Sequence, residues 1–222
     1  MGGDSAASLE AARAAMVARQ LRDRGIKDER VLWAMGELPR EAFLPDWRRE
    51  DAYADAALPI AAGQSISQPY VVARMTELLQ VRPGERVLEV GTGSGYQAAV
   101  LAMLGCRVLS IERQPELAAS ARDRLDRMGF GSSVEVRVGD GSLGDPVGAP
   151  WPRVIVTAAA PSIPDALREQ LDPDGGRLVI PVGPRYQQEL LWVVRHGDEW
   201  EERSDGPVVF VPLLGVEGYP LS

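Results

Sequence analysis

Val87-Leu88-Glu89-Val90-Gly91-Thr92-Gly93-Ser94-Gly95-Tyr96 is the stretch of this chain that decides its fold. Residues with strand-forming character lead into three glycines at every second position, and a helix-like run, 97–104, follows. A strand that turns sharply into a helix needs residues without a Cβ atom, because the backbone must bend tightly and leave room for a ligand. The N–H groups at the start of that helix then face the ligand. The stretch therefore predicts a strand, a ligand-binding loop and a helix.

The acid that precedes the glycines indicates which kind of ligand binds. Glu89 stands two residues before Gly91. A carboxylate there would repel the pyrophosphate of a dinucleotide, whereas it would attract the ammonium and the sulfonium of S-adenosylmethionine. The placement favours a methyl donor. The competing class, a dinucleotide-dependent oxidoreductase, also needs an acid or base at a hydride site, and none stands out in the sequence.

Two further acids follow apolar runs that read as the next strands. Glu112 lies 21 residues after Gly91, close to the spacing of about 20 typical of a carboxylate that binds the ribose hydroxyls. Asp140, in Gly139-Asp140-Gly141, is positioned to accept a hydrogen bond from an adenine amino group. Either acid alone reads equally well as a solvated charge at a strand end. Three such acids in register with one glycine loop favour a cofactor site.

Composition limits the classes of protein and partner. The chain has 222 residues, 45% of them hydrophobic, with a net charge of −8 and a pI near 4.8. We expect one domain, 1–222, and no nucleic-acid partner, since no basic stripe is available to neutralise phosphates. No run approaches the ~20 apolar residues of a membrane span, and Met1-Gly2-Gly3-Asp4 does not begin a signal peptide, so we expect neither.

The single Cys106 and the single His196 add two negative expectations. One cysteine cannot form an intramolecular disulfide, which fits a cytoplasmic protein. One histidine and one cysteine cannot assemble a zinc-type site, so we expect no metal.

Helical and strand patterns alternate along most of the chain. This alternation predicts a Rossmann-like α/β methyltransferase domain, a mostly parallel sheet with antiparallel C-terminal strands and an N-terminal helical extension. We divide the domain into a helical and substrate-loop extension, 1–80, and a Rossmann-like core, 81–222. The expected helices are 5–24, 28–35, 70–80, 95–104, 115–128 and 163–171, and the expected strands are 87–90, 107–112, 134–138, 153–158, 177–182, 190–195, 200–202 and 208–213.

Segments across the whole chain resemble the protein-L-isoaspartate O-methyltransferase family. The most distinctive are Ala52-Tyr53 with Ala57-Leu58-Pro59-Ile60, and Gly63-Gln64-Ser65-Ile66-Ser67-Gln68-Pro69, because general methyltransferases lack them. Pro150-Trp151-Pro152 departs from the family, which usually has an aspartate at the position of Pro152. The other matching segments are 16–26, 31–43, 87–101, 139–141, 158–161, 170–171, 180–183 and 210–213.

The resemblance implies roles for individual residues. Ser67 is the candidate catalytic residue. The candidate cofactor-binding residues are Glu89, Gly91, Thr92, Gly93, Ser94, Glu112, Arg113, Asp140 and Gly141, and the candidate substrate-binding residues are Gln64, Ser65, Ile66, Ser67, Pro69 and Val211. We expect the 52–69 region and the segment around Phe210 to form the walls of an open substrate groove.

The implied reaction transfers a methyl group from S-adenosylmethionine to the α-carboxylate of L-isoaspartyl residues in damaged proteins and peptides. The ester closes to a succinimide, and hydrolysis returns part of it to aspartate. A carboxylate is already ionised at neutral pH, so no general base is required. Ser67 would orient the substrate carboxylate, although from the residues alone it reads more readily as the cap of the helix that follows. The alternative is a methyltransferase of the same fold that modifies ordinary aspartate in a peptide natural product. We expect a monomer.

Three Asp-Gly pairs make the chain itself prone to succinimide formation, because glycine hinders backbone attack least. Asp140 should be held rigid by the sheet and the cofactor. Asp174 and Asp205 read as exposed turn or loop residues, and we expect isoaspartate to accumulate at one of these two positions.

Overall fold

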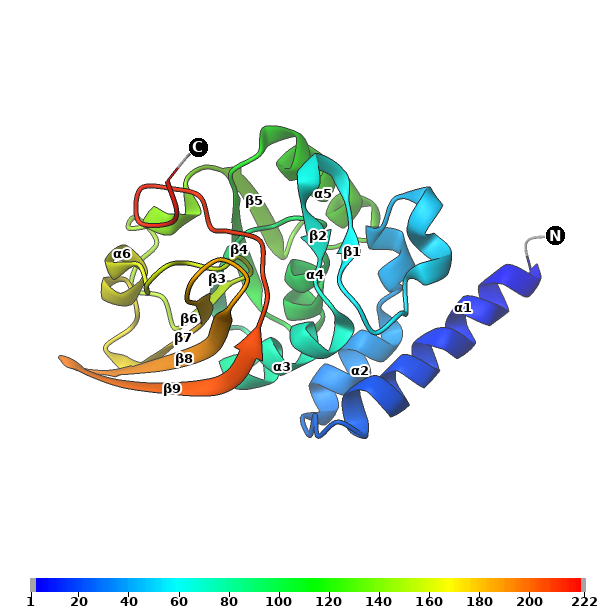
Figure 1. The fold of residues 1–222 in the computed structure, drawn as a ribbon, viewed down its shortest axis with the longest axis horizontal. Helices are drawn as coiled ribbons and strands as arrows, with labels where there is room; N and C mark the ends of the chain where they lie inside the picture. The colour runs from blue at the N-terminus through cyan, green and yellow to red at the C-terminus, as the bar shows by residue number, and fades with distance from the viewer. Residues whose placement is uncertain (1–2, 221–222) are drawn as a thin grey trace.

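The computed structural model describes residues 3–220, with side chains from residue 7 onward. Its centre is one seven-stranded sheet in the order β5-β4-β3-β6-β7-β8-β9. The first five strands in that order run parallel, and β8 and β9 run antiparallel to their neighbours (Figure 1). The strands are β3 (Arg86–Val90), β4 (Arg107–Glu112), β5 (Val134–Val138), β6 (Arg153–Val156), β7 (Asp174–Val182), β8 (Gln188–His196) and β9 (Glu199–Val208). The predicted fold class is confirmed.

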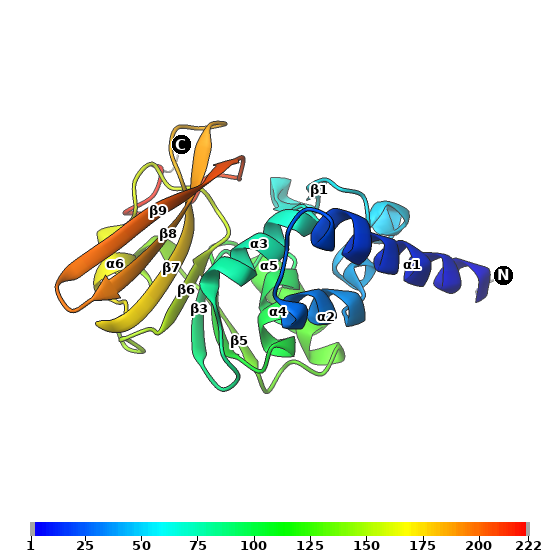
Figure 2. The same ribbon diagram turned by 90° about the horizontal axis from the view of Figure 1, so that it is seen from below.

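Alternate residues of each central strand pack on opposite faces of the sheet. Val87 and Val108 belong to one apolar core with the helices α2, α3, α4 and α5, whereas Leu88, Val90 and Leu109 belong to a second core with α6. Both faces are therefore buried, as in parallel sheets generally. Figure 2 shows α3, α4 and α5 on one side of the sheet and α6 on the other. The helices are α3 (Pro69–Leu79), α4 (Tyr96–Met103), α5 (Pro115–Arg127) and α6 (Asp165–Glu169).

The N-terminal extension packs against α3 and α4 on one face of the sheet. The predicted helix 5–24 is α1 (Gly3–Ala15), which continues as a π-helix, Met16–Arg22, and Figure 1 shows α1 extending away from the sheet. The expected helix 28–35 is α2 (Glu29–Glu37), and Asp28 caps it by accepting a hydrogen bond from the Arg30 N–H at 2.9 Å. Short 3₁₀ helices, Arg40–Phe43, Asp46–Asp51 and Ala61–Gly63, and the two-residue strands β1 (Leu58–Pro59) and β2 (Ser65–Ile66) lead into α3.

The end of the chain differs from the predicted strand 208–213. β9 already ends at Val208, and the following segment crosses the carboxyl ends of the parallel strands. The Ala159 N–H donates to the Val211 carbonyl at 2.8 Å, and the Leu213 N–H donates to the Ala159 carbonyl at 2.7 Å. The backbone groups of 209–214 are therefore bound partly to the loop after β6. This segment, the crossing segment, brings apolar side chains over the edge where ligands bind in such sheets.

The surroundings of Asp205 also correct a prediction. Asp205 and Gly206 lie within β9, not in a loop. The Arg74 guanidinium binds both carboxylate oxygens of Asp205, with Nε at 2.8 Å from Oδ2. Asp205 is therefore fixed by an ion pair between α3 and β9.

Two other predicted boundaries move. The helix expected over 163–171 is shorter, because Pro164 precedes its first turn and the helix ends at Glu169. The strand expected over 177–182 begins earlier, because Asp174, Gly175 and Gly176 form the bulged start of β7. Among residues 3–220, no helix combines the length and the apolar character that crossing a bilayer requires.

Candidate active site

The glycine loop has the geometry that the sequence predicts. Gly91, Gly93 and Gly95 all have positive φ angles, of 95°, 52° and 86°. A Cβ atom on Gly91 would lie 2.5 Å from the Thr157 hydroxyl, so only glycine fits there. A Cβ atom on Gly93 would have only Ile60 within 4.0 Å, which leaves the space beside it open. The loop is therefore packed against β6 at its first glycine and faces a cavity at its second.

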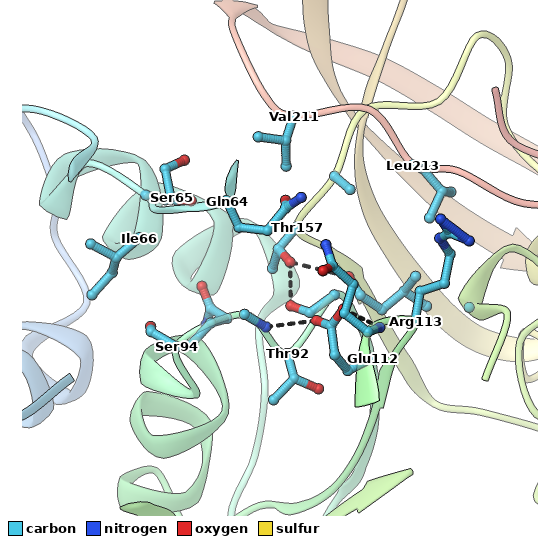
Figure 3. Close-up of a pocket in the computed structure, with 18 of the residues that line it drawn as sticks. Gln64, Ser65, Ile66, Thr92, Ser94, Glu112, Arg113, Thr157, Val211 and Leu213 are labelled. Carbon is cyan, nitrogen blue, oxygen red and sulfur yellow. Dashed lines mark hydrogen bonds between the residues drawn. The ribbon is translucent and has the colours of Figure 1, made fainter. Parts of the chain in front are cut away.

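That cavity, the cofactor pocket, lies at the carboxyl ends of β3, β4 and β6, where the strand order reverses. Ligands of open α/β sheets bind at such a switch point. Figure 3 shows Thr92, Ser94 and Glu112 at one side of the pocket and Gln64, Thr157 and Val211 at the other. The predicted residues in its wall are Gln64, Ser65, Ile66, Ser67, Gly91, Thr92, Gly93, Ser94, Glu112, Arg113, Gly141 and Val211.

Glu112 is the best-placed acid of the pocket. It ends β4, is 7% exposed, and lines the cavity. Its Oε2 accepts a hydrogen bond from the Gly93 N–H at 2.9 Å, and its Oε1 accepts one from the Gln114 N–H at 3.0 Å. One carboxylate thus joins the glycine loop to the loop after β4 while keeping lone pairs for a ligand, as a ribose-binding carboxylate requires.

Glu89, one of the predicted cofactor-binding residues, is not among the residues that line the pocket. Its side chain is fully buried and lies on the same face of the sheet as Val87, the face that α3, α4 and α5 cover. The Ser110 hydroxyl donates to Glu89 Oε2, and the Ser110 and Thr92 oxygens lie 2.5 Å apart. Burial raises the pKa of Glu89 to about 8. Glu89 therefore reaches the pocket only through Ser110 and Thr92.

Asp140 does not line the pocket, and three protein donors bind its carboxylate. Its Oδ1 accepts from the N–H and the hydroxyl of Ser142, at 2.9 and 2.7 Å, and its Oδ2 accepts from the Val216 N–H at 2.8 Å. Asp140 thus fastens the C-terminal segment, and the adjacent Gly141 contributes to the wall. Acceptance of an adenine hydrogen bond by the remaining lone-pair site of Asp140 stays a prediction. Pro69 also lies outside the wall, as the buried first residue of α3.

Several wall residues were missed by the sequence interpretation. Thr157 and Ala158 follow β6 directly, so the strand-end rule that identified Glu112 would have found them if it had been applied to the fourth strand. Leu213 and Leu214 come from the crossing segment, whose path no local pattern indicates.

A second cavity, the outer groove, adjoins the cofactor pocket. Four residues line both cavities, namely Ser65, Ser67, Thr157 and Val211. The rest of the outer groove comes from Ala57, Gln68, Val71, the loop 186–188 and the segment 207–210. Its walls therefore come from the 52–69 region and from the segment around Phe210, as expected for a substrate groove, and no lining residue carries a formal charge at neutral pH.

Ser67 lies where the two cavities meet and does not cap α3. The N-cap of that helix is Gln68, whose side chain makes no capping hydrogen bond. Ser67 is half-buried, and its carbonyl accepts a hydrogen bond from Arg40 Nη2 at 2.9 Å. The capping interpretation of Ser67 is therefore wrong, and Ser67 is one of the residues that line both cavities.

Three features define the class of this protein. The sheet is parallel with antiparallel final strands, a glycine loop follows β3, and an acid ends β4. These are the features of Rossmann-like S-adenosylmethionine-dependent methyltransferases. The sequence profile of one family of that class, described as protein-L-isoaspartate(D-aspartate) O-methyltransferase (PCMT), matches residues 12–218. The chain belongs to this family.

Relatives and solved structures agree. The chain is 55% identical over 206 residues to a protein-L-isoaspartate O-methyltransferase of Methylorubrum populi, covering 92% of this chain and 96% of the relative. It is 56% identical over 210 residues to protein-L-isoaspartate O-methyltransferase 2 of Marinobacter nauticus, covering 94% and 95%. A solved protein-L-isoaspartate O-methyltransferase superposes with a TM-score of 0.83 at 26% identity, over 93% of this chain and 67% of that one.

The fold is also shared with a more distant structure. A putative protein-L-isoaspartate O-methyltransferase of Plasmodium falciparum, solved in complex with S-adenosyl-L-homocysteine, superposes with a TM-score of 0.76 at 22% identity. The superposition covers 91% of this chain and 98% of that one.

Proposed function

We propose that the chain transfers a methyl group from S-adenosylmethionine to the α-carboxylate of L-isoaspartyl residues in damaged proteins and peptides. Membership of the family supports the reaction. The observation that carries the proposal for this chain is the meeting of two cavities at one wall formed by Ser65, Ser67, Thr157 and Val211. One cavity suits a small cofactor and the other is an open groove that suits a flexible peptide.

The residues of the cofactor pocket fit the methyl donor. The open space beside Gly93 admits a ligand close to the backbone, and Glu112 offers a carboxylate to ribose hydroxyls. We assign cofactor binding to Gly91, Thr92, Gly93, Ser94, Glu112, Arg113 and Gly141, which all line the pocket. When bound, S-adenosylmethionine supplies a methyl carbon attached to a positively charged sulfur.

The chain's own contribution to the reaction is positioning. The attacking oxygen belongs to a carboxylate that is ionised at neutral pH, so no residue has to remove a proton. The outer groove fits this requirement, because no histidine, lysine or carboxylate lines it. Holding the reacting atoms in line contributes up to about 7–11 kcal/mol to lowering such a barrier.

Ser67 is the residue that we assign to orientation of the substrate carboxylate. Ser67 lines both cavities and is not the N-cap of α3. It is therefore available to donate to the carboxylate from the groove side. Gln64, Ser65, Ile66 and Val211 complete the wall around it.

A methyl-transfer assay with matched peptides tests the proposal. Tritiated S-adenosylmethionine is supplied with two peptides of one sequence that carry either L-isoaspartate or L-aspartate at a single position. We expect base-labile tritium, typical of a methyl ester, on the isoaspartyl peptide alone. Equal or preferential labelling of the aspartyl peptide would instead favour modification of ordinary aspartate, and labelling of neither would contradict the proposal.

We also infer that the chain acts as a monomer in the cytoplasm. The single cysteine, Cys106, is buried and forms no disulfide within the described residues, which fits a reducing compartment. Light scattering of the purified chain during size-exclusion chromatography tests the monomer, and fractionation of cells tests the compartment.

A further inference from the structure

Arg40 connects the serine segment to the glycine loop. It begins the 3₁₀ helix Arg40–Phe43, and its side chain is completely buried. Its Nε donates to the Ala52 carbonyl at 2.8 Å, and its Nη2 donates to the Ser67 carbonyl at 2.9 Å. Its guanidinium also lies 5.1 Å from the centre of the Tyr96 ring, at the start of α4 in the wall of the cofactor pocket. One side chain thus contacts both halves of the candidate site.

The Arg40 charge has no acidic partner in the part of the chain that the structure describes. Neighbouring Glu41 accepts a hydrogen bond from the Tyr53 hydroxyl, and Arg40 forms no ion pair with any described carboxylate. Its Nη1 is buried and also has no partner among the described residues. Burial lowers the pKa of Arg40 to about 10, so that it stays protonated at neutral pH.

A fully buried cation without a counter-charge is costly, and stability alone does not account for it. The outer groove, however, lacks any cationic lining residue, although the proposed substrate presents a carboxylate there. The Arg40 guanidinium donates to the carbonyl of Ser67, the residue to which we assign orientation of that carboxylate. The position of the charge therefore matches a need of the groove.

We propose that Arg40 is a positioning residue for the reaction, in two respects. It holds the Ser67 segment through the carbonyls of Ala52 and Ser67, and its uncompensated charge favours a carboxylate in the outer groove. This inference rests on the proposed function, because it takes the isoaspartyl carboxylate as the group bound beside Ser67.

Two substitutions separate the two effects. Arg40→Met removes the charge and the donors while keeping an unbranched apolar stem. Arg40→Lys keeps the charge but loses the planar guanidinium, whose N–H donors bind the two carbonyls at once. Arg153→Met and Arg153→Lys are the controls for loss of a buried arginine. Arg153 is 9% exposed and donates to the Pro152 carbonyl at the opposite end of β6, but it pairs with Glu85 at 3.1 Å.

The measurements use the whole chain. Binding constants are measured in the presence of S-adenosylhomocysteine, which cannot react, for an isoaspartyl peptide and for the same peptide with a carboxamide in place of the α-carboxylate. The ratio of the two constants is the carboxylate preference. Turnover, kcat, is measured separately with saturating S-adenosylmethionine. Methyl transfer by the unsubstituted chain tests the proposed function, and only differences between variants test the role of Arg40.

We expect Arg40→Met to lower the carboxylate preference by about tenfold, the effect of a unit charge roughly 10 Å away at an effective dielectric constant of about 20. Arg40→Lys should keep that preference within about threefold. Turnover should fall at least about fivefold in both variants and stay close to the original in the Arg153 variants, because only Arg40 holds the Ser67 segment.

An unchanged preference in Arg40→Met, or an equal loss of turnover in Arg153→Met, would overturn the inference. If Arg40→Met does not fold, Arg40→Lys with Arg153→Lys decides. Lower turnover confined to Arg40→Lys, with the carboxylate preference retained, supports the role. Unchanged turnover in Arg40→Lys would contradict the role of Arg40, and so would an equal loss of turnover in Arg153→Lys.

Discussion

Replacement of Glu89 by glutamine should change how the stability of the chain depends on pH. Glu89 is fully buried in the sheet, and its pKa is raised from 4.5 to about 8. Burial is the largest cause, because a charged carboxylate loses its hydration there. The hydrogen bond from Ser110 opposes the rise, and repulsion from Glu112 adds to it. The folded chain therefore retains a proton on Glu89 at a pH at which the unfolded chain has lost it.

The sign and size follow from proton linkage. Between pH 4.5 and 8 the folded state binds one more proton at Glu89 than the unfolded state, so stability falls as the pH rises. The contribution of the Glu89 proton to the unfolding free energy is fully present below the unfolded pKa of 4.5. It is lost as the pH rises through the folded pKa of about 8. The slope is about 1.4 kcal/mol per pH unit, which amounts to about 2 kcal/mol between pH 6 and pH 8 because the titration is incomplete at pH 8. Glutamine keeps the shape and cannot titrate.

Urea unfolding of the original chain and of Glu89→Gln at pH 6, 7 and 8 measures this contribution, away from the pI near 4.8. All other titrating groups cancel when the two unfolding free energies are subtracted at each pH. We expect the difference to move by about 2 kcal/mol in favour of the variant from pH 6 to pH 8. Two parallel curves would show that Glu89 ionises at an ordinary pH and would refute the assignment of its burial as the dominant cause.

The parallel core of the fold could be predicted because its strands carry their own signal. β4 and β5 have the expected bounds, 107–112 and 134–138, since strands buried on both faces read as runs of apolar and β-branched residues that stop at turns. The glycine loop was equally clear, because the positive φ angle of Gly91 and its close approach to Thr157 leave no choice of residue.

The roles of the acids at the strand ends could be predicted only in part. Position along the chain shows that Glu112 and Asp140 end neighbouring strands, but not which donors reach them. Glu112 receives backbone N–H groups from its own and the preceding loop. Asp140 receives the N–H of Val216, which is 76 residues away in the sequence. Such a partner depends on the path of the crossing segment, and no local pattern specifies that path.

The side on which Glu89 lies was predictable in principle. Residues alternate between the two faces of a strand, so Glu89 shares its face with Val87 and not with Val90. Val90 lies in the pocket wall, whereas Glu89 is directed to Ser110 on the neighbouring strand. The sequence distance from Glu89 to Gly91 does not by itself indicate on which face of the strand the carboxylate lies.

Three further outcomes test the site and the fold. Ser67→Ala should lower kcat by more than about tenfold. Its unfolding free energy should stay within about 0.5 kcal/mol of the original, because Ser67 is not the N-cap of α3. A loss of stability with full turnover would contradict this. Asp140→Ala should cost about 1.5–3 kcal/mol of unfolding free energy, because its carboxylate accepts from Ser142 and Val216; unchanged stability in urea would contradict that. The last concerns ageing of the chain itself. Asp174 is exposed at the very start of β7, and the following Gly175 has a φ of 93° with no atom within 4 Å of a Cβ position, so neighbouring atoms do not crowd this pair. Asp205 is instead held by Arg74. We therefore expect isoaspartate at 174, not at 140 or 205, in protein stored warm at neutral pH and mapped by peptide digestion. Arg74→Gln should add isoaspartate at 205 by releasing that side chain, and isoaspartate found chiefly at 140, or at 205 in the unsubstituted chain, would show that local restraint does not decide where the chain is damaged.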